Sequence, residues 1–364
     1  MRPHRLPHHP GGRRGQRRLR PDPDGPARPA PCPHPLRLRL RGQGRLRRRL
    51  SRSAGPGDIG ALRHARPVPE LRVSKKFPII SVVGSSGAGT STVKNTFEQI
   101  FRREGVKSVS IEGDAFHRYN RADMKAELER RYAAGDATFS HFSYEANELK
   151  DLERVFREYG ETGRGRTRHY VHDANESERY GVPPGHFTDW APFEEDTDLL
   201  FYEGLHGCVV NDEVNLVQHA DLKLGVVPVI NLEWIQKIHR DRAQRGYTTE
   251  AVTDVILRRM HAYVHCIVPQ FSETDINFQR VPVVDTSNPF IARWIPTPDE
   301  SLIVIRFKNP RGIDFPYLTS MIAGSWMSRA NSIVVPGNKQ DLAMQLILTP
   351  LIERMVREAR RARA

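Results

Sequence analysis

Residues 84–92, Gly-Ser-Ser-Gly-Ala-Gly-Thr-Ser-Thr, constrain the fold of this chain more than any other segment. An apolar run at 78–83 precedes them and a segment of helical character follows at 93–103. A strand, a glycine turn and a helix in this order form a phosphate-binding loop, because loop N–H groups and the helix N-terminus face an anion. The spacing is that of a Walker A motif, except that Thr90 stands in the lysine position. We predict a nucleotide site whose missing cation comes from elsewhere; a glycine turn that binds nothing is the alternative.

The residues expected to contact the nucleotide in this loop are Gly84, Ser85, Ser86, Gly87, Ala88, Gly89, Thr90, Ser91 and Thr92.

Short apolar runs alternate with helical stretches from Lys75 onward. Strands are expected at 108–114, 199–204, 222–230, 280–285 and 301–307. Helices are expected at 121–134, 147–159, 232–245, 248–263 and 338–361, and the segment 160–192 reads mainly as loop with room for a strand at 168–172. The alternation predicts an α/β fold of the P-loop kinase type, with a mostly parallel, mixed sheet flanked by helices on both faces. Ligands of such sheets bind at the carboxyl ends of the strands.

Residues 1–73 differ in composition from the rest of the chain. They hold nineteen arginines, no lysine and four acidic residues, a net charge of +15, whereas the other 291 residues carry −2 of the formal +13. Thirteen of the 27 prolines lie here and no apolar period is sustained, so we expect a disordered extension. The presence of arginine without lysine favours the hypothesis that this segment is GC-rich upstream sequence, translated because the start codon was assigned too early. A nucleic-acid-binding arm and a targeting peptide are the alternatives. Residues 74–364 are expected to form a single α/β domain.

The three cysteines, Cys32, Cys208 and Cys266, show neither metal-ligand nor disulfide spacing, and no run of eighteen apolar residues exists. We expect buried free thiols at Cys208 and Cys266, no membrane association and a reducing, cytoplasmic location.

Two acidic residues end predicted strands near the loop. Asp114 closes one strand and Glu203 closes another. A carboxylate at Asp114 can accept the proton of an alcohol during phosphoryl transfer, and one at Glu203 can hold Mg²⁺ beside the Ser91 hydroxyl. A helix N-cap at Asp114 and a capped strand end at Glu203 are the alternatives.

A first group of cations follows Asp114. His117, Arg121 and Lys125 are spaced by four, so they would share one face if this segment is helical. Such a face suits a phosphorylated acceptor, since arginine binds phosphate bidentately. A solvated basic stripe is the alternative.

A second group lies on the helix expected at 232–245. Lys237, Arg240, Asp241 and Arg245 can share a face from which a mobile segment closes on the transferring phosphates. Lys237 is the first choice to replace the P-loop lysine and Arg240 the second. A surface helix with salt bridges explains the same spacing.

A resemblance to the phosphoribulokinases of the proteobacterial type rests on GSSGAGTSTVK, SIEGDAFHRYNRADMKAEL, FYEGLHG and VINLEWIQKIHRDRAQRGYTTEAV, and extends from about Ser74 to the C-terminus. The resemblance implies transfer of the γ-phosphate of ATP to O1 of ribulose 5-phosphate in the Calvin cycle, with Mg²⁺. It also implies a homo-oligomer, an octamer, that NADH activates.

Carried onto matching positions, the resemblance implies that Asp114 is the base and that Glu203 and Asp241 are catalytic carboxylates near the metal. Lys237 and Arg240 would serve the phosphates of ATP, and His117, Arg121 and Arg245 the sugar phosphate. Effector-linked arginines would be Arg103, Arg306 and Arg329. No cysteine lies in the loop, so the thiol regulation of plant-type members is not expected.

Other functions stay open from the residues alone. A uridine or pantothenate kinase would share the loop, the strand-end acid and the cationic helix; the pair His117 and Arg121 argues for a phosphorylated acceptor instead. Thr90 suggests an inactive homologue, and the arginine-rich extension a nucleic-acid-binding protein, a class that the charge of the remaining chain disfavours.

Overall fold

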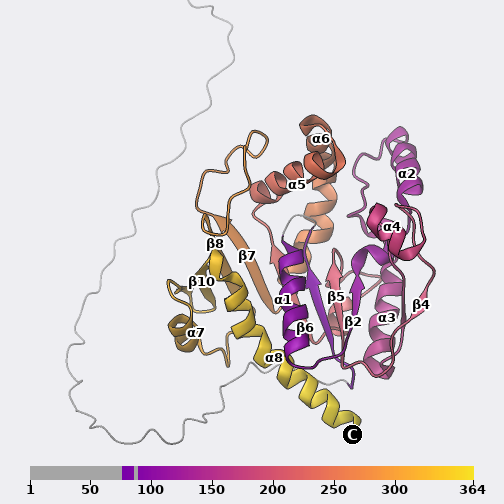
Figure 1. The fold of residues 1–364 in the computed structure, drawn as a ribbon. Coiled ribbons are helices and arrows are strands. Elements are labelled where there is room, and N and C mark those ends of the chain that lie inside the picture. The colour runs from indigo at the N-terminus through magenta and orange to yellow at the C-terminus, as the bar shows by residue number, and fades with distance from the viewer. Residues whose placement is uncertain (1–75, 86–88) are drawn as a thin grey trace, which may run out of the picture. The chain divides into compact units, whose positions relative to one another are not determined.

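An eight-stranded mixed sheet forms the centre of the part of the chain that the computed structural model describes, residues 76–85 and 89–364 (Figure 1). The strand order is β2-β5-β1-β6-β7-β8-β10-β9. The parallel strands are β2 (Ser108–Glu112), β5 (Leu199–Gly204), β1 (Ile79–Val83), β6 (Leu222–Val227) and β7 (Ile276–Pro282). The antiparallel strands are β8 (Ser301–Phe307), β10 (Ser332–Pro336) and β9 (Trp326–Arg329). The predicted fold class is confirmed, whereas the predicted extension at 1–73 lies outside the described residues.

Helices cover both faces of the sheet. α1 (Thr90–Arg103), α7 (Phe315–Met321) and α8 (Gln340–Arg363) pack on one face, and α3 (Leu149–Thr162) packs on the other. Ile80 and Val82 of β1 enter the first core and Ile79 enters the second, because successive side chains of a strand point to opposite faces. β1 is buried along its whole length, as expected of a parallel strand covered on both sides.

Four further helices lie near the carboxyl ends of the parallel strands. α2 (Arg121–Ala133) and α4 (Ala174–Tyr180) lie together in Figure 1, and α5 (Ile230–Arg245) and α6 (Thr249–Ala262) lie together at the same end of the view. A separate pair of short strands, β3 (Arg166–Thr167) and β4 (Ala191–Pro192), flanks α4 in sequence. α5 and α6 pack on each other through Ile238, Val252 and Ile256.

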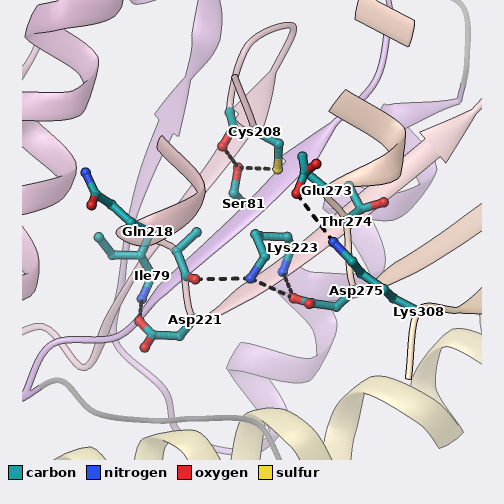
Figure 2. A network of polar contacts seen from close by, with 12 residues as sticks. Ile79, Ser81, Cys208, Gln218, Asp221, Lys223, Glu273, Thr274, Asp275 and Lys308 are labelled. Atoms are coloured by element: carbon teal, nitrogen blue, oxygen red, sulfur yellow. Dashed lines mark hydrogen bonds and ion pairs between the residues drawn. The ribbon is translucent and has the colours of Figure 1, made fainter. Parts of the chain in front are cut away.

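Three aspartates fasten the amino ends of the parallel strands. Asp198, Asp221 and Asp275 stand directly before β5, β6 and β7. Each carboxylate accepts a hydrogen bond from a backbone N–H near the start of a neighbouring strand: Lys107 to Asp198 (3.0 Å), Ile79 to Asp221 (2.9 Å) and Lys223 to Asp275 (2.8 Å). Figure 2 shows the last two, with the Lys223 ammonium also paired to Asp275 at 3.0 Å. A slip of one residue would leave these N–H groups without their acceptors, so the aspartates help to fix the register.

Asp198 also ties α8 to this edge. The Arg360 guanidinium donates to both carboxylate oxygens of Asp198 (2.8 and 2.7 Å), and Arg363 donates to one of them (3.1 Å). Burial alone would raise the pKa of Asp198, but the Arg360 hydrogen bond, the Lys107 N–H and the positive charges lower it overall.

Several short elements were not predicted from the sequence. α4 was read as loop because it buries none of its residues; the Asp173 side chain caps it and Gly181, with φ +69°, ends it. The strand expected at 168–172 is reduced to a single bridge at Tyr170. α7, β9 and β10 were also missed, and β7 begins at Ile276 instead of 280.

Cys208 and Cys266 are buried free thiols, as predicted, and burial raises the pKa of Cys208 to about 12. Cys32 lies outside the described residues. In the described part of the chain, no helix combines the length and apolar character needed to cross a bilayer.

Replacing Asp198 with alanine should lower the free energy of unfolding by about 2 kcal/mol, because a backbone N–H and two guanidinium groups lose their acceptor. The folded state lowers the pKa of Asp198. Its stabilisation is therefore present above the unfolded-state pKa of about 4 and is lost as the pH falls through the folded-state pKa. Urea unfolding at about pH 7 and about pH 3 should show a smaller difference between wild type and Asp198→Ala at the lower pH.

Asp212→Ala, at an exposed position, is the control and should change stability by less than about 0.5 kcal/mol. Equal destabilisation by the two substitutions would contradict the role assigned to Asp198.

Candidate active site

The glycine loop joins β1 to α1, as predicted. The Gly84 N–H donates to the Gly204 carbonyl at the end of β5 (3.2 Å), and a Cβ on Gly84 would lie 2.6 Å from Cγ2 of Thr90. Gly89 precedes α1 with φ +99°, a left-handed conformation that favours glycine. Both ends of the loop therefore have the strand-turn-helix geometry of a phosphate site.

The middle of the loop is not part of the described structure. Ser86, Gly87, Ala88 and the side chain of Ser91 lie outside the described residues. Their contacts with nucleotide stay predictions, as does that of Thr92, whose backbone N–H donates to Gly89 O (3.1 Å) in the first turn of α1.

Thr90, in the lysine position, hydrogen-bonds Glu203 through its side chain. Glu203 lies opposite Glu112 in the pairing of β5 with β2, and Lys94 of α1 forms an ion pair with Glu112 (2.6 Å). Burial raises the pKa of Glu203, and the negative charges of Asp114 and Glu112 raise it further. Three acidic side chains, Glu112, Asp114 and Glu203, thus lie near one edge of the sheet, and their negative charges favour the binding of a cation there.

The residues at this edge fit magnesium held jointly with nucleotide phosphates. Among the residues described, no three His, Cys, Asp or Glu side chains gather in a way that could hold a metal alone. Mg²⁺ usually takes one or two protein oxygens and completes its shell with water and phosphate oxygens. Glu203, at the tip of β5 beside the loop, could supply such an oxygen, and Ser91 follows Thr90 in α1.

A close backbone contact brings Asp114 to Glu203. Asp114 lies in η1 (Gly113–Phe116), the 3-10 turn that follows β2. A Cβ added to Gly204 would lie 2.6 Å from Cα of Gly113, so the ends of β2 and β5 approach more closely than larger residues permit. The turn with Asp114 therefore follows directly on this contact, and the Asp114 charge helps to raise the pKa of Glu203.

Two histidines face the Asp114 carboxylate. His117 Nε2 lies 3.2 Å from Oδ1, and His172 Nε2 lies 3.5 Å from Oδ2. The next helix, α2, takes Asn120 as its N-cap, so the alternative that Asp114 caps that helix is excluded.

His117 does not share a helix face with Arg121 and Lys125, because the condition that the whole segment is helical is not met. His117 has extended backbone angles (φ −62°, ψ 137°), and α2 begins only at Arg121 because the Asn120 side chain accepts the Asp123 N–H. A helix cap at this point separates His117 from the helical spacing.

The three side chains consequently differ in position. Arg121 donates to the His172 carbonyl (2.9 Å) and so lies on the side of the acids. The Lys125 side chain is 80% exposed and lies 4.0 Å from Glu129, which places it with the solvated face of α2.

His117 is the first member of a buried polar chain. Its Nδ1 lies 2.8 Å from Oδ1 of Asn147, and Nδ2 of Asn147 lies 3.2 Å from Nε2 of His206. Burial lowers the pKa of His206 to about 3. Burial also acts to lower the pKa of His117, but the Asp114 charge and hydrogen bonds outweigh it and raise that pKa.

Arg168 holds the backbone of this segment. Its guanidinium donates to the carbonyls of Ala115 (2.8 Å) and His117 (2.9 Å) and lies over the Phe187 ring, 3.7 Å from the centroid. The turn that carries Asp114 is therefore fixed from two sides.

The inner face of α5 carries paired charges. Lys237, 9% exposed, donates to Asp241 at 2.5 Å, and Arg240 Nε donates to the other Asp241 oxygen at 3.1 Å. Burial and then the charge of Arg259 lower the pKa of Lys237 to about 8. The predicted shared face is confirmed for Lys237 and Asp241, whereas the side chain of Arg245 lies outside the described residues.

α5 also touches the nucleotide loop. Glu233, one turn before Lys237, accepts a hydrogen bond from Ser85 Oγ (2.6 Å) and is buried, which raises its pKa to about 7. A hydrogen bond therefore joins α5, the helix that carries Lys237 and Arg240, directly to the loop.

Sequence reasoning missed Lys94, Glu112, His172 and Glu233. Two signals were available: Lys94 lies one turn after Thr90 on α1, and Glu112 is an acid at the end of a predicted strand, two residues before Asp114. No local pattern marks His172, which comes from a loop distant in sequence.

The candidate effector arginines lie on different elements. Arg306 of β8 and Arg329 of β9 both lie opposite Ser332 of β10, so they occupy one row of the sheet. Arg103, at the end of α1, donates to Gln345 (2.9 Å) and Thr349 (2.7 Å) of α8. α8 packs on the face that receives Ile305, opposite to that of Arg306, so within this chain the three are not brought together.

Comparison with known proteins places this site in a family. The sequence model of the phosphoribulokinase / uridine kinase family matches residues 79–287. "Phosphoribulokinase 2" of Cereibacter sphaeroides is 93% identical over 292 residues, which cover 80% of this chain and 100% of the relative. "Phosphoribulokinase" of Nitrobacter vulgaris is 69% identical over 288 residues, 79% of this chain and 99% of the relative.

A solved structure, phosphoribulokinase from Rhodobacter spheroides, matches with 83% identity and a TM-score of 0.73, covering 79% of this chain and 100% of that one. With a family model that spans more than half of the chain and relatives matched along their whole length, the chain belongs to the phosphoribulokinase / uridine kinase family.

Proposed function

We propose that this chain is a phosphoribulokinase, which transfers the γ-phosphate of ATP to O1 of ribulose 5-phosphate and forms ribulose 1,5-bisphosphate, the CO₂ acceptor of the Calvin cycle. The observation that carries the proposal is the position of Asp114 beside Glu203, with His117 and His172 at its two oxygens. The relatives named phosphoribulokinase support the same activity.

In the proposed reaction, Asp114 accepts the proton of the O1 hydroxyl while that oxygen attacks the γ-phosphorus and ADP leaves. Phosphoryl transfer demands positioning and charge neutralisation more than covalent catalysis. Glu203 and Ser91 would hold Mg²⁺, which would supply part of this charge when the nucleotide is bound. The two imidazoles, one at each oxygen of Asp114, fix the orientation of its carboxylate.

The cations of α5 are proposed to serve ATP. Lys237 and Arg240 would meet the transferring phosphates, and Asp241, which receives hydrogen bonds from both, would orient them. Since Thr90 offers no charge, Lys237 is the first candidate to replace the P-loop lysine. Lys94 is a second source of charge at this edge.

The sugar phosphate is proposed to bind His117 and Arg121, with Arg245 and the more exposed Lys125 as further contacts. Support comes from Arg121, which reaches the His172 carbonyl next to Asp114. A fixed arginine there suits a phosphate dianion, since its planar donors bind two oxygens at once.

Regulation and assembly are proposed from family resemblance. The proposal includes NADH activation through Arg103, Arg306 and Arg329, a homo-oligomer of eight subunits, a cytoplasmic location and a single domain at 74–364. We also expect no nucleic-acid function.

Turnover of ATP with ribulose 5-phosphate, uridine and pantothenate as acceptors tests the assignment. We expect strong preference for ribulose 5-phosphate, because the site offers cations for an acceptor phosphate that the other two lack. Preference for uridine would replace the assignment with the uridine-kinase alternative, and no turnover with any acceptor would favour an inactive homologue. Measuring residues 74–364 with and without NADH tests the activation at the same time.

Asp114→Asn should lower kcat by about 10²–10⁴-fold, because the amide cannot accept the hydroxyl proton. The Kd of ATP should stay nearly unchanged, since the Asp114 carboxylate faces the two histidines. Steady-state kinetics and a direct nucleotide-binding measurement check the two parts. Asp123→Asn, in the exposed first turn of α2, is the matched control. An equal loss of ATP affinity would point to a metal-binding or folding role for Asp114.

Arg121→Ala should raise the KM for ribulose 5-phosphate by about tenfold or more, the loss expected when a charge-assisted hydrogen bond worth about 1.5–3 kcal/mol is removed. The KM for ATP should change little. Arg130→Ala, on the same helix with a 66% exposed side chain, is the control. Equal changes in both KM values for Arg121→Ala would show that the residue supports the fold of the site and not the acceptor.

A further inference from the structure

The side-chain amide of Asn147 has one orientation that its surroundings allow. Asn147 is 4% exposed and follows the turn η2 (Tyr144–Ala146). Its Nδ2 lies 3.0 Å from the carbonyl oxygen of His141 and 2.8 Å from that of Ser143. Carbonyl oxygens only accept, so the NH₂ group must face them and Oδ1 must face away.

This orientation decides where His117 carries its protons. Oδ1 of Asn147 lies 2.8 Å from Nδ1 of His117 and can only accept, so Nδ1 must be protonated. Nε2 of His117 lies 3.2 Å from Oδ1 of Asp114. An ionised carboxylate also only accepts, so this contact is favourable only when Nε2 is protonated as well. Two acceptors on opposite sides of one ring therefore select the doubly protonated imidazolium.

We propose that Asn147 is a positioning residue that holds His117 as an imidazolium beside the ionised Asp114. The inference rests on the proposed function, in which Asp114 is the base and His117 faces the sugar phosphate. The imidazolium keeps Asp114 ionised and oriented until the hydroxyl proton arrives, and it presents a positive charge to an anionic acceptor.

The other groups around His117 leave this arrangement intact. His206 Nε2 lies 3.2 Å from Nδ2 of Asn147, and burial lowers the pKa of His206 to about 3, so His206 stays neutral and places no further positive charge beside the amide. Burial and the charge of Arg168, whose guanidinium binds the His117 carbonyl, oppose the imidazolium. The rings of His141 and Tyr170 lie nearly perpendicular to the His117 ring, each with its centroid 6.1 Å from the His117 centroid. The attraction of Asp114 and the hydrogen bonds prevail, and the pKa of His117 is raised.

The backbone here is held independently of the Asn147 side chain. His117 and Asn147 form an antiparallel bridge, Arg118 N–H donates to Ala146 O (2.9 Å), and Glu148 N–H donates to Phe116 O (2.7 Å). Substitutions of the amide are therefore expected to change the proton positions on His117 with the two chain segments still paired.

Two variants separate positioning from a structural role. Asn147→Asp and Asn147→Leu both lose the donation to the His141 and Ser143 carbonyls, but aspartate keeps an acceptor for His117 Nδ1 and leucine does not. The alkaline limb of the pH profile of kcat/KM should move to lower pH by about one unit in Asn147→Leu. In Asn147→Asp it should stay in place or move to higher pH. A purely structural role predicts the same shift in both, and that result would overturn the proposal.

Nitrogen-15 NMR of ring-labelled histidines tests the proposal on the wild-type protein without substrate. The His117 signals, assigned with His117→Asn, should show two protonated nitrogens at about pH 7, while His206 shows one. A neutral His117 at that pH would end the proposal even if the kinase activity is present. Failure to phosphorylate ribulose 5-phosphate would instead remove the proposed function and leave the proton assignment standing.

Discussion

The parallel pairing of β2, β5 and β1 is the constraint on which the site depends. Its register sets Glu112 opposite Glu203, and Val83 opposite Gly204, so segments far apart in sequence end at one edge. The contact between Gly113 and Gly204 leaves no space for side chains and brings the turn with Asp114 next to that edge. Carboxylates so placed repel one another, and the apolar cores on the two faces of the sheet hold them there.

Much of this arrangement could be predicted because buried strands and long helices leave clear patterns. β8 was predicted with its observed bounds, and acids that end strands marked the functional edge. α4 buries no residue and left no apolar period to detect. The polar contacts around Asp114 were harder to predict. His172, which faces Asp114, comes from a distant loop, and His117 contacts the side-chain amide of Asn147, 30 residues away; such contacts form only on folding.

Thr90 changes how positive charge is supplied to the site. A lysine at position 90 would carry its charge at the start of α1, whereas the cations here lie one turn further along α1, at Lys94, and on α5, at Lys237. Lys94 pairs with Glu112 and Lys237 pairs with Asp241, so an acid holds each of the two cations in position. The hydrogen bond from Ser85 to Glu233 connects the loop with the helix of Lys237, and the position of that helix thereby affects the loop.

The aspartates at the amino ends of the strands have a practical consequence. Asp198, Asp221 and Asp275 bind backbone N–H groups at the edge opposite to Asp114 and Glu203. The same strands thus carry structural acids at one end and, at the other, the two acids for which we propose roles in the reaction. Substitutions that raise stability can therefore be designed around Lys223 and Lys308 while Asp114 and Glu203 stay unchanged.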